Sequence, residues 1–137
     1  MVGILIVTHG NFGTELLKSA ELIIGKQENV ETLGLNPSDD IKELYIAVRS
    51  SIKKLDKGDG VLILTDLFGG SPTNVTAASI SDYKCESVSG VNLPMLIETL
   101  DSREFMPLEE LTAKTIQSGV EGIKNVKNEL GNKANSI

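Results

Sequence analysis

The chain has 137 residues, enough for one domain with a substantial core, and a formal net charge of −6. Because it lacks clusters of Lys and Arg with interleaved aromatic residues, we expect no nucleic-acid partner, and no apolar run approaches the roughly 20 residues that a membrane span requires. The single cysteine, Cys85, excludes an internal disulfide and a multi-cysteine metal site, and it fits the reducing cytoplasm in which we expect the protein to act.

The first predicted element is a strand that begins at Val2 and ends at the only histidine of the chain, His9. Its residues are almost continuously aliphatic or β-branched, a pattern typical of a strand buried on both faces of a sheet. Functional groups gather past the carboxyl ends of the strands in open parallel sheets, and histidine combines nucleophilic ring nitrogens with a pKa near neutrality. This stretch alone leaves two interpretations open: His9 takes part in chemistry, or it only closes a turn through hydrogen bonds.

Two helices and an outer strand follow. Apolar residues at helical spacing predict a helix over 13–24, and a weaker apolar pattern predicts a strand over 29–35. Ser38 or Asp39 can cap a second helix, which we expect to run to Leu55.

Segment 61–65 repeats the pattern of the first strand and predicts a second central strand. Gly69 and Gly70 then precede Ser71, which we expect to cap a helix that reaches Ile80. Glycines let the backbone approach a bound group, and the free amides at the start of a helix favour an anion. The same residues also fit an ordinary helix cap with a flexible approach.

The last third of the chain predicts one more strand and two helices. The strand is expected over 83–91, and a helix follows Pro94. A final helix is predicted over 107–126, in which Gly119 and Gly122 either weaken the helix or permit close packing.

The alternation of strands and helices predicts an α/β fold with an open, mainly parallel, doubly wound sheet and right-handed crossovers. We expect one domain over 1–130, followed by a flexible polar tail over 131–137. Because the carboxyl ends of parallel strands meet at one edge of a sheet, His9, Asp66 and Asn92 can face one crevice, with the glycine loop beside them.

These residue types suit phosphoryl transfer through a phosphohistidine. A neutral imidazole can attack phosphorus with one nitrogen while the Asp66 carboxylate holds the other N–H, and amides near Gly69 to Ser71 would stabilise the phosphoryl oxygens. The glycine loop lacks the lysine of a Walker motif, and the first strand is not followed by the dinucleotide-binding fingerprint. One histidine and one cysteine do not make a zinc hydrolase, so we predict no metal and no cofactor.

Three segments together, 7–10, 65–72 and 90–96, resemble the enzyme IIA domain of the mannose family of the bacterial phosphoenolpyruvate-dependent sugar phosphotransferase system. The resemblance extends from residue 1 to about residue 127, with the motifs in the family's order and at its spacing.

The resemblance implies a phosphotransferase component that works as a phosphocarrier. The histidine phosphocarrier protein HPr would phosphorylate His9 on Nε2, Asp66 would contact the other ring nitrogen, and the group would pass to the IIB component of a mannose, fructose, sorbose or amino-sugar permease. Because the chain stops without a IIB domain, we expect IIB to be a separate protein and the membrane to be reached only through the permease. The other residues expected in the phosphate-binding pocket are Thr8, Gly10, Phe68, Gly69, Gly70, Ser71 and Asn92.

For the fold, the resemblance implies the strand order 2-1-3-4 and a homodimer completed by an exchanged antiparallel strand, which segment 126–130 would supply. Two alternative functions remain at this point. One is the phosphoryl donor subunit of dihydroxyacetone kinase, which shares the fold and the histidine but whose glycine loop usually differs from 69–72 here. The other is a regulatory module that is phosphorylated as a signal and keeps its phosphate.

Overall fold

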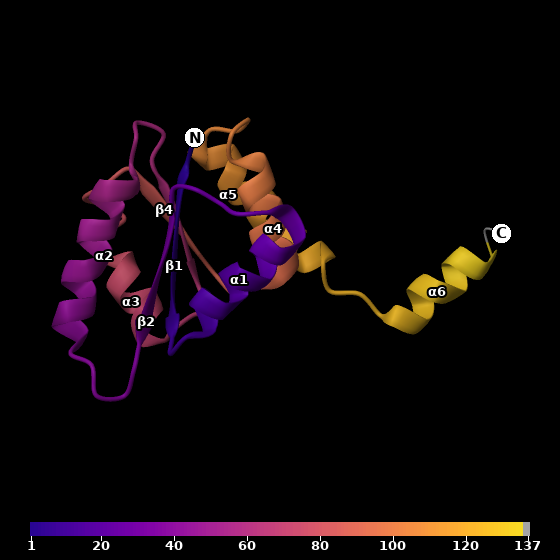
Figure 1. Ribbon diagram of the computed structural model, residues 1–137, viewed down its shortest axis with the longest axis horizontal. Helices are drawn as coiled ribbons and strands as arrows, with labels where there is room; N and C mark the ends of the chain where they lie inside the picture. Colours follow the sequence, from indigo (N-terminus) through magenta and orange to yellow (C-terminus); the bar gives the residue numbers. More distant parts are fainter. Residues whose placement is uncertain (136–137) are drawn as a thin grey trace.

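Four parallel strands form a sheet in the order β2-β1-β3-β4, as expected for an open α/β fold (Figure 1). The computed structural model describes residues 1–135. The strands are β1 (Gly3–His9), β2 (Val30–Leu35), β3 (Val61–Thr65) and β4 (Cys85–Ser89). The helices are α1 (Phe12–Ile24), α2 (Ile41–Leu55), α3 (Ser71–Ala77), α4 (Leu93–Ser102), α5 (Leu108–Glu121) and α6 (Val126–Asn135).

Helices cover both faces of the sheet, and this explains why the central strands carry uninterrupted apolar sequences. Ile4 and Ile6 of β1 face a core formed with α1, α4 and α5, whereas Leu5 and Val7 face a second core formed with α2 and α3. All four side chains are fully buried. Figure 1 shows the same division, with α2 and α3 on one side of the strands and α1, α4 and α5 on the other.

The register between β1 and β3 brings two polar strand ends together. Val7 of β1 pairs with Thr65 of β3, so the residues that follow, up to His9 on one strand and Asp66 on the other, emerge at the same edge of the sheet. On the other side of β1, His9 pairs with Leu35, the last residue of β2.

Two predicted helix caps are wrong by one residue. Gly70, with extended backbone, is the N-cap of α3, and Ser71 is its first helical residue. At α2, Asp40 is the cap and accepts a hydrogen bond from the Lys42 amide, because the Asp39 carboxylate is engaged at 2.7 Å by the amide of Asn36 within the preceding turn. Helix α3 also ends at Ala77, before Ile80.

The long C-terminal helix predicted over 107–126 is two helices. Helix α5 ends at Glu121, Gly122 caps it, and α6 begins at Val126. Gly122 lies against the ring of Pro94, where a Cβ would overlap the ring carbons, so close packing explains this glycine.

Helix α6 projects away from the sheet and its flanking helices (Figure 1). The boundary expected after residue 130 falls inside this helix, and residues 136–137 of the expected tail lie outside the described residues. Segment 126–130 is helical in the single chain, and its exchange as a strand between two copies stays a prediction.

Candidate functional site

His9 stands at the carboxyl end of β1 with 49% of its side chain exposed. The chain turns immediately after it, since Gly10 adopts a φ of +54° and its amide donates a hydrogen bond to the Leu35 carbonyl at 2.8 Å. Thr8 is fully buried, and its hydroxyl accepts a hydrogen bond from the Gly13 amide at 2.9 Å. Thr8 therefore supports the turn from below and connects it to the start of α1.

Asp66 holds the imidazole from the neighbouring strand. Its Oδ2 lies 2.7 Å from Nδ1 of His9 and accepts the His9 backbone amide at 2.9 Å, while its Oδ1 accepts the Leu67 amide at 3.0 Å. Only 12% of the Asp66 side chain is exposed. This burial by itself raises the pKa of the carboxyl, but the hydrogen bonds from His9 and Leu67 outweigh it, so the pKa of Asp66 is lowered.

The contact with Asp66 also decides which ring nitrogen of His9 is free. An ionised carboxylate only accepts hydrogen bonds, so Nδ1 carries the proton in the neutral ring and Nε2 keeps its lone pair. With the other nitrogen oriented in this way, Nε2 is the ring nitrogen whose lone pair is available.

The glycine loop lies in front of the ring. A Cβ at Gly70 would be 3.0 Å from Cε1 and 3.6 Å from Nε2 of His9, so the missing side chain leaves room at the reactive edge. Gly69 turns the chain with a φ of +89°, Phe68 is 84% exposed, and Ser71 follows as the first residue of α3. The structure thus places Gly70 of this loop beside the His9 ring.

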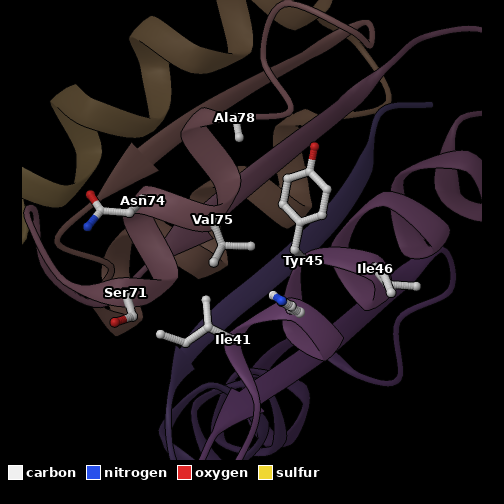
Figure 2. A pocket seen from close by; sticks show the side chains of 8 residues that line it. Ile41, Tyr45, Ile46, Ser71, Asn74, Val75 and Ala78 are labelled. Carbon is white, nitrogen blue, oxygen red and sulfur yellow. The ribbon is translucent and has the colours of Figure 1, made fainter.

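Two neighbouring hollows share Ile41. One has a volume of about 340 Å³ and lies beside His9. The other, of about 510 Å³, is a groove between α2 and α3; Figure 2 shows Ser71 near Ile41 at one end, with Tyr45 and Val75 on opposite walls. The residues around the first hollow are His9, Gly10, Leu35, Asn36, Pro37, Asp39 and Ile41. Sequence reasoning missed Leu35 and Ile41 at the site, although placing β2 beside β1 would have indicated the end of β2.

Asn92 is engaged away from His9. Its Oδ1 accepts the Met95 amide at 2.9 Å and caps α4, and its Nδ2 donates to the Gly119 carbonyl of α5 at 3.0 Å. Both polar groups of the side chain thus connect helices, and the structure does not bring Asn92 to the imidazole.

Within residues 1–135, no three His, Cys, Asp or Glu side chains gather as ligands for a metal ion. None of the helices among these residues is long and apolar enough to cross a membrane.

The chain matches a known protein family over most of its length. The family model EIIA-man, described as the fructose IIA component of the phosphotransferase system (PTS), matches residues 3–116. The chain belongs to the EIIA-man family. It is therefore a PTS EIIA component of the mannose and fructose group, and its sheet has the four-strand order that the resemblance implied.

Individual members of the EIIA-man family agree with this assignment. The chain is 40% identical over 128 residues to the PTS system mannose-specific EIIAB component of Escherichia coli K12; this match covers 92% of the chain but only 40% of that relative's length. It is 33% identical to the PTS system fructose-specific EIIA component of Bacillus subtilis, over 81% of this chain and 77% of the relative. The crystal structure of EIIA from Streptococcus agalactiae has a TM-score of 0.85 and 36% identity, over 93% and 99% of the two chains.

Proposed function

We propose that this chain is a phosphocarrier that accepts a phosphoryl group from phospho-HPr on His9 and passes it to a IIB component of a mannose-family sugar permease. The observation that carries the proposal is the 2.7 Å contact between Nδ1 of His9 and Asp66, which leaves Nε2 free beside the side-chain-free Gly70. Membership of the EIIA-man family supports the same reaction class, and the mannose-specific and fructose-specific PTS components among its relatives indicate sugar transport.

The proposed step is an exchange of one N–P bond for another. The lone pair of His9 Nε2 attacks the phosphorus of the donor's phosphohistidine, the donor's N–P bond breaks, and its electron pair returns to the donor ring. The proton on Nδ1 stays on His9, where Asp66 stabilises the positive charge that develops on the ring. In the transfer to IIB, His9 is the donor. A histidine of IIB attacks the phosphorus, the N–P bond at His9 breaks, and its electron pair returns to the His9 ring.

We expect the glycine loop to serve the phosphoryl oxygens. Gly70 is close to the ring because it has no side chain, and the amides of Gly69, Gly70 and Ser71 would donate to oxygens of a group attached at Nε2. Gly10 would supply the space beside the ring, and Phe68 would offer an exposed contact to the docked partner.

We place this relay in the cytoplasm, where a free buried cysteine such as Cys85 stays reduced. Its partners are then HPr, a IIB component and a second copy of the chain, and the permease provides the connection to the membrane.

Intact mass spectrometry tests the proposal. The purified chain is incubated with phosphoenolpyruvate, enzyme I and HPr, and the wild type is compared with His9→Ala. We expect the wild type to gain one phosphoryl group that is lost in acid, and the variant to gain none. If the wild type gains nothing while HPr in the same tube is phosphorylated, the carrier function is wrong.

A second stage separates a carrier from a regulatory module. Phosphorylated protein, freed of HPr, is mixed with a mannose-family IIB component. A carrier loses its added mass as IIB gains it, whereas a module that only senses phosphorylation keeps the group.

A further inference from the structure

We propose that Thr73 is a positioning residue for the His9–Asp66 pair. Thr73 lies in the first turn of α3, and its hydroxyl donates a hydrogen bond of 2.6 Å to the backbone carbonyl of Leu67, the residue that follows Asp66. The inference rests on the proposed function for its effect on rate, but its effect on the geometry of the site can be measured without any phosphoryl donor.

The direction of this hydrogen bond follows from the neighbouring hydroxyl. Thr65, the last residue of β3, is fully buried, and its Oγ1 lies 3.1 Å from Oγ1 of Thr73. The carbonyl of Leu67 can only accept a hydrogen bond, so the Thr73 hydroxyl donates to it. The same hydroxyl therefore accepts a hydrogen bond from the Thr65 hydroxyl. The Thr73 hydroxyl thus connects the two residues that flank Asp66, one at the end of the strand and the other at the start of the loop.

The backbone amide of His9 fixes the Asp66 carboxylate to β1, and the bond from Thr73 fixes the loop that follows Asp66. Leu67, Phe68 and Gly69 are exposed, and Gly69 is free to adopt other turns because it has no side chain. The hydrogen bond from the Leu67 amide to Asp66 is internal to this segment and does not fix it to the rest of the fold. The bond from Thr73 joins the segment to α3, whose buried Val75 packs in the core beneath it.

Removing the Thr73 hydroxyl should therefore change which nitrogen of the neutral His9 ring carries the proton. In Thr73→Val the side chain keeps its shape, but the Leu67 carbonyl loses its donor and Asp66 is held less firmly against Nδ1. We expect the proton of the neutral ring to be shared between Nδ1 and Nε2, whereas in the wild type it is held on Nδ1. A ring with its proton on Nε2 cannot attack phosphorus from that nitrogen, so phosphoryl acceptance should slow about fivefold, the effect of one lost neutral hydrogen bond.

The experiment records ¹⁵N chemical shifts of the His9 ring in unphosphorylated protein, which report the tautomer directly because the chain has one histidine. The rate of phosphoryl acceptance is then measured on the same samples. Thr73→Ser keeps the hydroxyl and should restore both readouts. Thr112→Val is the matched control, since its hydroxyl donates only to the Leu108 carbonyl one turn earlier in α5.

A second variant separates positioning from general stability. Thr65→Val breaks the pair of hydroxyls but leaves the bond from Thr73 to Leu67, so it should lower stability and leave the ring spectrum unchanged. If Thr73→Val does not fold because Thr65 is left buried and unpaired, the double variant Thr65→Val/Thr73→Val removes both hydroxyls and is compared with Thr65→Val alone.

The proposal is wrong if Thr73→Val, or the double variant in its place, has the ring spectrum of its reference protein, or if Thr65→Val alters the spectrum equally. Failure of the proposed function has a different signature: the wild type would accept no phosphoryl group, whatever the spectra show.

Discussion

Asp66 connects the site to the stability of the fold. Its three hydrogen-bond contacts come from His9 and Leu67, and they lower the pKa of its carboxyl in the folded chain. A carboxylate with a lowered folded-state pKa contributes stability above its unfolded-state pKa, about 3.9, and loses that contribution as the pH falls through the lower, folded-state value.

Asp66→Asn should therefore remove part of the acid sensitivity of the protein. We expect the wild type to be more stable than the variant near neutral pH, and the difference to shrink as the pH falls below the unfolded-state pKa of about 3.9. Urea unfolding of both proteins at a series of pH values measures this difference in unfolding free energy. A stability difference that stays constant through this range would show that the charge of Asp66 does not contribute.

Substituting Gly70 tests how much space is needed beside Nε2 of His9. Its backbone, with φ −82° and ψ 170°, is one that alanine adopts freely, so Gly70→Ala introduces no backbone strain. The new methyl group would stand 3.0 Å from Cε1 and 3.6 Å from Nε2 of His9, so the ring or the loop must shift and the approach to Nε2 becomes narrower.

We expect Gly70→Ala to slow phosphoryl acceptance about tenfold, with stability within about 1 kcal/mol of the wild type. A time course of mass gain and a urea titration measure the two effects. Gly131→Ala, at an exposed position with no atom near the added methyl, is the control and should change neither. Wild-type rates in Gly70→Ala would mean that the loop moves away from the ring during transfer.

Among the structural elements, the carboxyl end of α4 depends on one buried cation. Arg103 is only 2% exposed, and its guanidinium donates hydrogen bonds to the backbone carbonyls of Glu28 and Asn29 and to the side chain of Gln27. It connects α4 to the loop between α1 and β2. Burial lowers the pKa of Arg103, but five N–H donors in a planar fork remain well suited to several carbonyls at once.

Arg103→Leu should cost about 3 kcal/mol of unfolding free energy, because the loop carbonyls lose their donors inside the protein. Arg103→Lys should recover only part of the loss, since one ammonium group cannot reproduce the fork. Urea unfolding measures both variants. Lys114→Leu, which removes only a surface ion pair with Glu98, should stay within about 0.5 kcal/mol, and an equal effect of the two leucine substitutions would contradict the assignment.

The strands and helices also show which features can be predicted from the sequence. Strands β1 and β3 were predicted because burial on both faces leaves continuous apolar runs, and His9 and Asp66 were paired because both follow such runs. The α2 cap was predicted at Ser38 or Asp39 and lies at Asp40, because the Asp39 carboxylate is engaged by a turn that folds back on Asn36. Asn92 was misassigned to the crevice because a helix cap and a ligand contact occupy the same place at a strand end.

At the scale of the whole molecule, the end of α5 could not be read from sequence because it is decided by a distant contact. A glycine in a helical pattern is compatible with continuation or termination, and it is the approach of Pro94 to Gly122 that accompanies termination here.

Strand β4 forms one edge of the sheet, and apolar side chains lie beside it. In the described residues β4 pairs only with β3, and beside its free edge lie the exposed side chains of Ile116, Val120 and Ile123 around a hollow of about 150 Å³. Helix α6 extends away from the same chain with Val126 and Leu130 exposed. We propose that the C-terminal segment of one copy covers the β4 edge of another.

Light scattering at micromolar concentration should accordingly give twice the 14.7 kDa mass of the chain. Val120→Asp places a charge in the apolar surface and should shift the protein toward monomer, whereas Leu22→Asp, on the exposed face of α1, should not. A monomeric wild type would contradict the dimer and with it the exchanged strand.

The pairing of β1 with β3 determines when His9 and Asp66 meet during folding. His9 and Asp66 are 57 residues apart, and they meet only through the alignment of Val7 with Thr65. A slip of one residue between these strands would displace one partner by about 3.3 Å and point it to the opposite face of the sheet. A nascent chain that has not yet emerged from the ribosome beyond β3 therefore has the histidine without its carboxylate, and the pair forms only when β1 and β3 align in the sheet.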